Sequence, residues 1–558
     1  MSEHFEGQPS LTAHPPRFDG DWPEGLDADT APQAALLHAA DDDLGDDLIA
    51  GLATAAPPSI ERPRSHRRTG KRRKSPSLGA RAARGGVTVM AGQAVRIVIQ
   101  VASVSILARL LSPTDYGLVA IVLAIVGVGE IFRDFGLSTA AIQAKVVTDD
   151  QRDKLFWLNT GIGASLTVLC VLAAPLVAVV FHQAALTPIT RALSFTFLLN
   201  GMAAQHEADL NRHFRFAGLV TVNIGSQAFG MVIAVAMAAA GAGYWALVAQ
   251  QIAAGILTLA WFVALTRWIP RPPKRGVDVR TFVKFGFGLV GSQMIGYLNN
   301  NVDTVTIGIR FNATQLGYYN RGFQLLMRPL SQLRTPTTSV ALPVLAKMRD
   351  DDARTDAFLL QGQLALGYSL VASVAIAAGA ARPMVHVFLG DQWSSVAPVF
   401  GLLALAGVFQ TISYVGNWVY LSRALTGSLV WYSMVSLAIK IICVLVGSTW
   451  GIVGVAAGFA LAPALSWPIS IWWLSRLTRL PTRALYGGAG RILLCSGISA
   501  AATFAVVEVL RSSPALVQLS CGVAAGVLVY GPLALVPRIR QDLADVLSVT
   551  RSAVQGRR

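Results

Sequence analysis

Two apolar stretches, FGFGLVGSQMIGYLNNNVDTVTIGI at residues 285–309 and LGYYNRGFQLLMRPLSQL at residues 316–333, decide the fold of this 558-residue chain. Each is close to the roughly 20 residues that a helix needs to cross the hydrocarbon layer of a membrane. Both nevertheless carry polar residues spaced to share one helical face. The first face holds Gln293, Asn300 and Asp303, and the second holds Arg321, Gln324, Arg328 and Gln332. Because a charge facing lipid costs roughly a few kcal/mol or more, these faces are expected to line a polar cavity.

A similar polar stripe, formed by Gln93, Arg96, Gln100 and Ser103, lies in the first apolar span. Gln93, Gln100 and Ser103 precede Gln293, Asn300 and Asp303 by 200 residues each. The following turns, TDYG from Thr114 and TQLG from Thr314, match at the same offset of 200. A later pair, GYWALVA at 243 and GIVGVAA at 451, matches at a slightly larger offset. These matches predict an internal duplication, and a duplicated bundle with polar faces at mid-membrane is typical of transporters.

The composition predicts an all-α, polytopic membrane protein, because 53% of the residues are hydrophobic, 14% are charged and the mean hydropathy is +0.52. The net charge of +15 indicates membrane orientation rather than nucleic-acid binding, since the basic residues gather in loops between apolar spans. The four cysteines lie in apolar segments without metal-binding spacing, and a packing role is expected for them.

About fourteen spans are expected, arranged as two six-helix lobes and a final pair. They are expected at 87–111, 117–139, 156–181, 188–208, 217–240, 243–266, 283–309, 316–345, 357–380, 397–421, 427–448, 451–474, 490–510 and 515–536. Basic residues alternate between the intervening loops, which predicts that both termini are cytoplasmic. The N-lobe is then 85–266, the linker 267–280, the C-lobe 281–476, and the final pair with a cytoplasmic tail 477–558.

Residues 1–84 are expected to form a disordered cytoplasmic tail, acidic at first and then basic. No apolar region with a cleavage site marks them as a signal peptide. The basic run ERPRSHRRTGKRRKSPSLGARAAR at 61–84 is expected to contact anionic membrane lipid, and nucleic-acid binding through KRRK is the less favoured alternative.

The deep cations of the spans suit an anionic ligand, because an arginine matches phosphate or carboxylate oxygens with two parallel hydrogen bonds. The residues expected to line the substrate cavity are Gln93, Arg96, Gln100, Asn300, Arg321, Gln324, Arg328 and Lys440. Asp303 and Glu130 are candidates for coupling to a proton or sodium ion. The alternative for Arg96 is a structural ion pair with Glu130 or Asp303, and the alternative for Asp303 is a contact between helices.

Nothing in the sequence points to an enzyme, a cofactor or a metal site. A nucleotide-binding glycine loop, zinc-ligand spacing and a Ser-His-Asp pattern are all missing from the sequence. The loops on the outer side are also short for a membrane-bound transferase. We therefore expect transport without ATP hydrolysis by this chain.

Three segments resemble the Wzx-type polysaccharide-transport flippases of the multidrug/oligosaccharidyl-lipid/polysaccharide exporter superfamily. They are ILARLLSPTDYGLVAIVLAIVGVGEIFRDFGLSTAAIQ at 106–143, GYWALVAQQ at 243–251 and FGFGLVGSQMIGYLNNNVDTVTIGIRFNATQLGYYNRGFQL at 285–325. The resemblance covers roughly residues 86–476 well and the last two spans loosely.

The resemblance implies two lobes facing a central cavity in the plasma (inner) membrane. It also implies that alternating access moves a polyprenyl-pyrophosphate-linked oligosaccharide outwards, for lipopolysaccharide or exopolysaccharide synthesis. Cation exchange is the implied energy source, although no definite coupling carboxylate matches the family. The arginine often found in the first span of these flippases would be Arg96.

Two other functions are weighed against this one. A cation-coupled multidrug antiporter of the same superfamily should have an acidic cavity, which the deep cations oppose. A non-transporting scaffold would use residues 1–84 as a docking arm for polysaccharide polymerase or assembly proteins. A membrane-embedded transferase ranks behind both.

Overall fold

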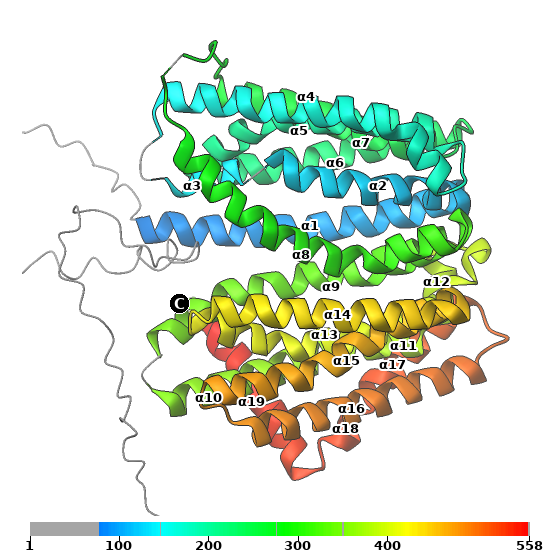
Figure 1. The fold of residues 1–558 in the computed structure, drawn as a ribbon. Coiled ribbons are helices and arrows are strands. Elements are labelled where there is room, and N and C mark those ends of the chain that lie inside the picture. The colour runs from blue at the N-terminus through cyan, green and yellow to red at the C-terminus, as the bar shows by residue number, and fades with distance from the viewer. Residues whose placement is uncertain (1–77, 135, 145–146, 275, 349–350, 556–558) are drawn as a thin grey trace, which may run out of the picture. The chain divides into compact units, whose positions relative to one another are not determined.

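The computed structural model describes residues 78–555, except for 135, 145–146, 275 and 349–350. The described part consists of helices and connecting turns, with no strand, so the all-α prediction is confirmed (Figure 1). The acidic and basic tail, with its expected lipid contact, lies outside the described residues up to position 77. Residues 78–84, which were expected to belong to that tail, are helical.

The N-lobe contains seven helices among the described residues. They are α1 (Leu78–Leu110), α2 (Pro113–Asp134), α3 (Leu137–Gln143), α4 (Asp149–Val180), α5 (Leu186–Arg212), α6 (Phe216–Ala239) and α7 (Trp245–Thr266). The short α3 was not expected from the sequence. It follows Gly136, which has a φ of 64° and turns the chain at the end of α2.

The C-lobe begins with α8 (Arg280–Arg310) and α9 (Ala313–Lys347). It continues through α10 (Asp352–Leu366), the π-helical turn η3 (Gly367–Val371), α11 (Ala372–Gly379), α12 (Ala381–Leu389) and the short η4 (Asp391–Trp393). It ends with α13 (Val396–Ser422), α14 (Thr426–Gly447), η5 (Ser448–Trp450) and α15 (Gly451–Leu477). The chain then forms α16 (Thr482–Val509), α17 (Ala515–Leu528), α18 (Tyr530–Leu533) and α19 (Pro537–Gln555).

Ten helical segments in the described part are long and apolar enough to cross a membrane, and one of them, 426–477, contains both α14 and α15. The helices α5, α8 and α9 have the length but are not among these segments. Helices α8 and α9 carry residues of the predicted cavity, and α5 carries Gln205, His206, Glu207 and Asp209. The exact number of fourteen crossings therefore stays a prediction.

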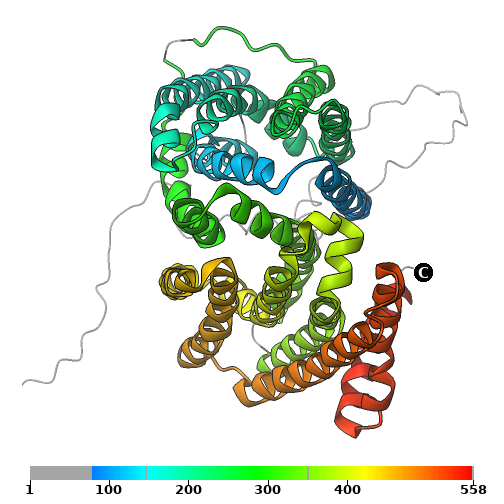
Figure 2. The same ribbon diagram turned by 90° about the vertical axis from the view of Figure 1, so that its right-hand side faces the viewer.

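The two lobes use the same helix contacts, as Figures 1 and 2 allow the reader to follow. In the N-lobe α1 packs on α6, α6 on α7, α5 on α7, and α2 on α5. In the C-lobe α8 packs on α14, α14 on α15, α13 on α15, and α9 on α13. Each C-lobe pair is the counterpart of an N-lobe pair in chain order, so the repeat seen in the sequence is also a repeat of packing.

The turns that leave α5 and α13 have the same geometry. Phe214 and Ala424, which are 210 residues apart in number, have left-handed backbones with φ of 53° and 54°. The amide that follows each one donates to the carbonyl five residues before it, at 2.9 and 2.8 Å. This is the Schellman motif, in which glycine is usual at the left-handed position. Neither lobe has glycine there, so the sequence does not reveal this correspondence.

The turns that begin α2 and α9 touch each other across the lobes. The hydroxyls of Thr114 and Thr314 lie 2.8 Å apart and share a hydrogen bond. These two residues are equivalent in the predicted repeat, with an offset of 200. A residue contacts its own counterpart only where the pseudo-twofold axis passes between them, so the axis lies at this contact.

Two equivalent glycines allow the backbones of α2 and α9 to meet beside this contact. A Cβ atom at Gly117 would lie 1.6 Å from the carbonyl oxygen of Ala313. A Cβ atom at Gly317 would lie 1.9 Å from the carbonyl oxygen of Pro113. Any other residue at either position would push the two helices apart.

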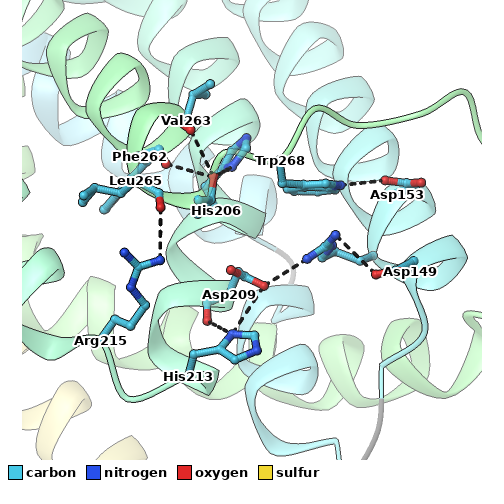
Figure 3. A network of polar contacts seen from close by, with 12 residues as sticks. Asp149, Asp153, His206, Asp209, His213, Arg215, Phe262, Val263, Leu265 and Trp268 are labelled. Carbon is cyan, nitrogen blue, oxygen red and sulfur yellow. Dashed lines mark hydrogen bonds and ion pairs between the residues drawn. The ribbon is translucent and has the colours of Figure 1, made fainter.

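The linker is held against the N-lobe by a polar network (Figure 3). The indole nitrogen of Trp268 donates to Asp153 at 3.1 Å, and the guanidinium carbon of Arg152 lies 4.2 Å from the centre of the Trp268 ring. Arg152 also pairs with Asp209 of α5 at 3.1 Å and with Asp149 at 3.3 Å. The start of the linker is therefore joined to both α4 and α5.

The rest of the linker continues along α4. The indole nitrogen of Trp157 donates to the carbonyl oxygen of Arg271 at 2.8 Å. Lys274 forms an ion pair with Asp150 at 2.8 Å. Contacts with α4 thus recur along the linker before α8 begins at Arg280.

Helix α8 contacts both lobes. Near its start Phe282 is buried in a cluster with Leu137 of α3 and Leu155 of α4. Further along, the hydroxyl of Tyr297 donates to the carbonyl oxygen of Ala124 on α2 at 2.5 Å. Helix α8 also packs on α14 and α15 of the C-lobe, and at Gly308 it still lies beside Phe181 and Ile121 of the N-lobe.

Candidate functional site

A cavity of about 300 Å³ lies between the lobes, where α1 faces α9. We call it the central cavity. Its polar lining comes from α1, α6, α7 and α9, namely Arg96, Gln100, Ser103, Gln227, Gln250, Gln251, Asn320, Arg321, Gln324, Arg328 and Gln332. Three arginines and no acidic residue stand among the described residues that line it.

Arg96 is exposed to the central cavity and forms no ion pair with any described residue. The expected structural alternative paired it with Glu130 or Asp303, and that pairing is wrong in this structure. Glu130 instead accepts from Nε of Arg133 at 2.5 Å, and Asp303 lies 3.8 Å from the ammonium of Lys440. The positive charge of Arg96 is therefore available to a ligand.

Arg321 is almost fully buried in the wall of the same cavity, with 4% of its surface exposed. Its guanidinium carbon lies 3.2 Å from the centre of the Tyr116 ring, and Nη1 donates to Gln324 at 3.0 Å. Its Nε has no hydrogen-bond partner among the described residues. A buried guanidinium held by one amide and one ring keeps unused capacity to donate to an anion.

Gln332 joins the central cavity to an apolar groove. Its amide donates to Gln100 at 2.8 Å across the lobes, and its side chain lines both spaces. The groove has a volume of about 700 Å³ and is formed by α1, α9, α10 and α13, with Ile97, Leu333, Pro336, Val340, Phe358, Leu366 and Trp418 in its wall. Gln93, which was expected in the polar cavity, lines this groove instead.

A larger space of about 890 Å³, the N-lobe cavity, continues from Arg96 into the N-lobe. Glu130 lines it and is bonded by both Arg133 and the amide of Asn200, the latter at 2.8 Å. Its described lining contains two arginines and two glutamates, Arg96, Arg133, Glu130 and Glu207, so its charges balance. The remaining polar groups are amides and hydroxyls, which suit hydrogen bonding to sugars.

A third space of about 470 Å³, the C-lobe cavity, shares Arg328 with the central cavity. Arg328 and Asn300 are exposed there, and Arg334 and Lys440 also line it. No acidic residue occurs among the described residues of its lining. This cavity is therefore more cationic than its N-lobe counterpart.

Lys440 and Asp303 form a buried pair at the wall of the C-lobe cavity. Asp303 is 0% exposed and Lys440 is 8% exposed, and their charged atoms lie 3.8 Å apart. The ammonium also donates to the carbonyl oxygen of Asn299 and lies 4.1 Å from the centre of the Phe459 ring. Neither carboxylate oxygen of Asp303 has a hydrogen bond with a described residue. Lys440 therefore supplies the counter-charge of this buried carboxylate, and the buried Tyr319 lies close to it.

The structure brings most of the predicted residues together in three adjoining cavities. Arg96, Gln100, Arg321, Gln324 and Arg328 line the central one, while Asn300 and Lys440 line the C-lobe cavity. The analysis of the sequence missed Gln227, Gln250, Gln251, Asn320 and Arg334. Two of these end the motif GYWALVAQQ, so their polar pair on an apolar helix was a usable signal.

The fold is similar to that of a solved structure described as the lipid II flippase MurJ in an inward closed conformation. The TM-score is 0.61 at 12% sequence identity, and the match covers 81% of this chain and 99% of that chain. At this identity the likeness concerns the fold.

Two curated proteins are similar over most of their length. The teichuronic acid biosynthesis protein TuaB of Bacillus subtilis (strain 168) is 25% identical over 441 residues, which is 78% of this chain and 91% of TuaB. The lipopolysaccharide biosynthesis protein WzxC of Escherichia coli (strain K12) is 22% identical over 369 residues, which is 65% of this chain and 74% of WzxC. The family described as "Polysaccharide biosynthesis protein" matches residues 106–398, more than half of the chain. The motifs around both repeat-related turns fall inside that match, and the chain belongs to the polysaccharide biosynthesis protein family.

Proposed function

We propose that this protein is a flippase that moves polyprenyl-pyrophosphate-linked oligosaccharide repeat units across the plasma membrane. The units would serve the synthesis of a cell-surface polysaccharide or exopolysaccharide. The observation that carries the proposal is the junction at Gln332, where a cationic cavity meets an apolar groove. A ligand that fills both spaces has an anionic group beside an apolar chain.

The arginines of the central cavity favour a phosphate-bearing group. Arg96 and Arg328 are exposed to the cavity without an acidic partner among the described residues. Charge-assisted hydrogen bonds from a guanidinium to phosphate are roughly twice as strong as neutral ones. The same charges oppose the alternative of a cationic drug as the ligand, because that ligand would need acidic groups in the wall.

The adjoining spaces suit the two other parts of such a ligand. The apolar groove would hold the polyprenyl chain near its entry from the bilayer. The N-lobe cavity, with its balanced charges and many amides, would hold the sugars. This assignment needs no catalytic residue and no cofactor.

Alternating access is supported by the way the cavities are closed. The contact between Thr114 and Thr314 seals one end, which we call the closed end, while the N-lobe cavity reaches Ser138 and Asn211 towards the other end. The alternation of basic loops predicts that the closed end is outside and that both termini are in the cytoplasm. The protein would then be in its inward-facing state.

We also place the coupling ion at Asp303. Its carboxylate lies 3.8 Å from the ammonium of Lys440, so a proton or sodium ion bound there would weaken the attraction between the two side chains. Glu130, the other candidate, is already bonded by Arg133 and Asn200. Exchange of the cation would therefore alter the contact between α8 and α14, which belongs to the C-lobe.

The test is the leaflet distribution of lipid-linked oligosaccharide in cells that carry the protein, lack it, or carry Arg96→Ala with Arg328→Ala. We expect oligosaccharide to accumulate on the cytoplasmic leaflet in the deletion strain and in the double variant. The matched control is Arg382→Ala with Arg511→Ala, which removes two exposed arginines that pair with Glu508 away from the three cavities.

Normal outward distribution in a deletion strain without a second flippase would overturn the proposed function. Normal distribution in the Arg96/Arg328 variant alone would keep the function but remove these residues from the binding site. Loss of function on removing residues 1–84, with no effect of the cavity variants, would favour the scaffold.

A further inference from the structure

The closed end is built from residues of both lobes around Tyr116. Its ring packs edge-on against Trp393, with 5.5 Å between ring centres. The indole nitrogen of Trp393 donates to the carbonyl oxygen of Ala108 at 2.7 Å, and Gln392 donates to the same oxygen at 2.6 Å. Tyr116 and Ala108 belong to the N-lobe, whereas Trp393 and Gln392 belong to the C-lobe. The rings and bonds thus hold the two lobes together here.

Arg321 contacts both this end and the central cavity. Its guanidinium lies against the Tyr116 ring at 3.2 Å, and the same side chain lines the cavity. Tyr116 directly precedes Gly117, where α2 touches α9 through the backbone. A movement of Arg321 therefore acts on the residue next to the closest contact between the lobes.

We propose that Arg321 is a latch, which keeps the closed end shut through Tyr116 until an anionic group in the central cavity draws the guanidinium away. The proposal rests on the proposed function only in taking the ligand to be anionic. It assigns a role to one arginine of the cavity that Arg96 and Arg328 do not share, because neither of them is stacked on a ring of the closed end.

The bonding of Arg321 explains why an anion would displace it. In the closed state the guanidinium has one bond to a neutral amide, a stacked ring, and an Nε without a hydrogen-bond partner among the described residues. Phosphate oxygens would accept from several of its nitrogens at once. A ligand shifts a conformational equilibrium only when it binds one state better than the other, and this difference in bonding supplies that preference.

The repeat makes the closed end easy to monitor. The hydroxyl oxygens of Thr114 and Thr314 are 2.8 Å apart, so cysteines at both positions lie close enough to form a disulfide while the end is shut. The pair is introduced into a protein whose four native cysteines, Cys170, Cys443, Cys495 and Cys521, are replaced by serine or alanine. Disulfide formation by copper phenanthroline is followed as loss of thiol labelling in proteoliposomes.

We expect rapid cross-linking without ligand and several-fold slower cross-linking with undecaprenyl pyrophosphate in the vesicles. Undecaprenol, which has the same chain without phosphate, should have no effect. In an Arg321→Gln background the cysteine pair should cross-link more slowly without ligand, and undecaprenyl pyrophosphate should change the rate no further.

Variants of the stacked ring separate a latch from a merely structural arginine. Tyr116→Phe keeps the ring and should keep the response to undecaprenyl pyrophosphate, whereas Tyr116→Leu should lose it. Arg96→Gln, which alters a cavity arginine that does not touch Tyr116, should need more ligand but reach the same final slowing. Size-exclusion profiles of each variant show whether it is folded.

Three results would overturn the latch. They are the same cross-linking rate with and without undecaprenyl pyrophosphate in a folded protein, an unchanged response in Arg321→Gln, and no disulfide at all. A response of cross-linking without flipping of lipid-linked oligosaccharide would overturn the proposed function and leave the latch. Flipping without any response would do the reverse.

Discussion

The C-lobe buries a charge pair where the N-lobe has two small, uncharged residues. Asp303 on α8 corresponds to Ser103 on α1, at the repeat offset of 200. Lys440 on α14 corresponds to Gly230 on α6, at the offset of 210 that relates Ala424 to Phe214. Ser103 accepts a weak hydrogen bond from Gln250 at 3.4 Å, whereas Asp303 faces an ammonium.

The comparison shows that the two halves share their packing but not their charges. The same helix pairs meet in both lobes, and both lobes contribute a cavity next to the central one. In the N-lobe cavity the two arginines are balanced by two glutamates. In the C-lobe cavity every charged residue of the described lining is a cation. Under the proposed function, the N-lobe cavity would bind the sugars and the C-lobe charge pair would couple movement to a cation.

The largest effect is expected when the charge pair of each lobe is removed in turn, which tests whether cation coupling belongs to the C-lobe alone. Asp303→Asn with Lys440→Met leaves no buried charge in the C-lobe pair and should abolish the dependence of flipping on a cation gradient. Glu130→Gln with Arg133→Gln is the matched N-lobe change and should leave that dependence in place. The measurement is flipping in vesicles with the proton and sodium gradients collapsed one at a time. Equal dependence in both variants would contradict the placement of coupling at Asp303.

A second prediction concerns stability. Lys440→Met alone leaves Asp303 buried without its counter-charge, which should destabilise the protein by about 3–5 kcal/mol. Adding Asp303→Asn should restore most of that loss, because no unpaired charge is left. Ser103→Ala at the N-lobe position should change stability by about 1 kcal/mol or less, since it removes one weak hydrogen bond. Thermal unfolding in detergent compares the four proteins, and a double variant as unstable as Lys440→Met would show that the pair is not energetically coupled.

The smallest effect is expected when single cavity arginines are replaced, and it should depend on whether the arginine has an acidic partner. Arg328 lacks an acidic partner among the described residues, whereas Arg133 is bonded to Glu130. Arg328→Gln should weaken the binding of undecaprenyl pyrophosphate about tenfold, which corresponds to about 1.4 kcal/mol. Arg133→Gln should weaken it less than Arg328→Gln. Titration of the purified variants by tryptophan fluorescence measures both, and the reverse order would move the phosphate into the N-lobe.

Much of the fold could be predicted from the internal repeat of the sequence. The polar stripes and the turns recur at a constant offset, and the helix contacts recur with them. The match of TDYG with TQLG marks the place where the two lobes touch. The left-handed turns at Phe214 and Ala424 could not be predicted, because neither residue is a glycine. Nor could the break of the region after Lys347 into α10, a π-helical turn and α11, since no proline or charge marks it.

The site could be predicted less completely. A stripe on one helix shows which residues avoid lipid, but not which residues of other helices they face. Lys440 and Asp303 are 137 residues apart in sequence, and only the packing of α14 on α8 shows that they pair with each other. The same limit explains why Gln93 was assigned to the polar cavity, although it lies beside the groove.

The bound linker has a consequence for how force passes between the halves of the molecule. Because the linker is bound along α4, it does not act as a flexible connection between the lobes. Along α8, Tyr297 is fastened to the N-lobe and Asn299, two positions later, is fastened to Lys440 of the C-lobe. Relative rotation of the lobes would therefore strain α8, which is attached to both of them. A cation bound beside Lys440, as proposed, would therefore act on the helix that joins the two lobes.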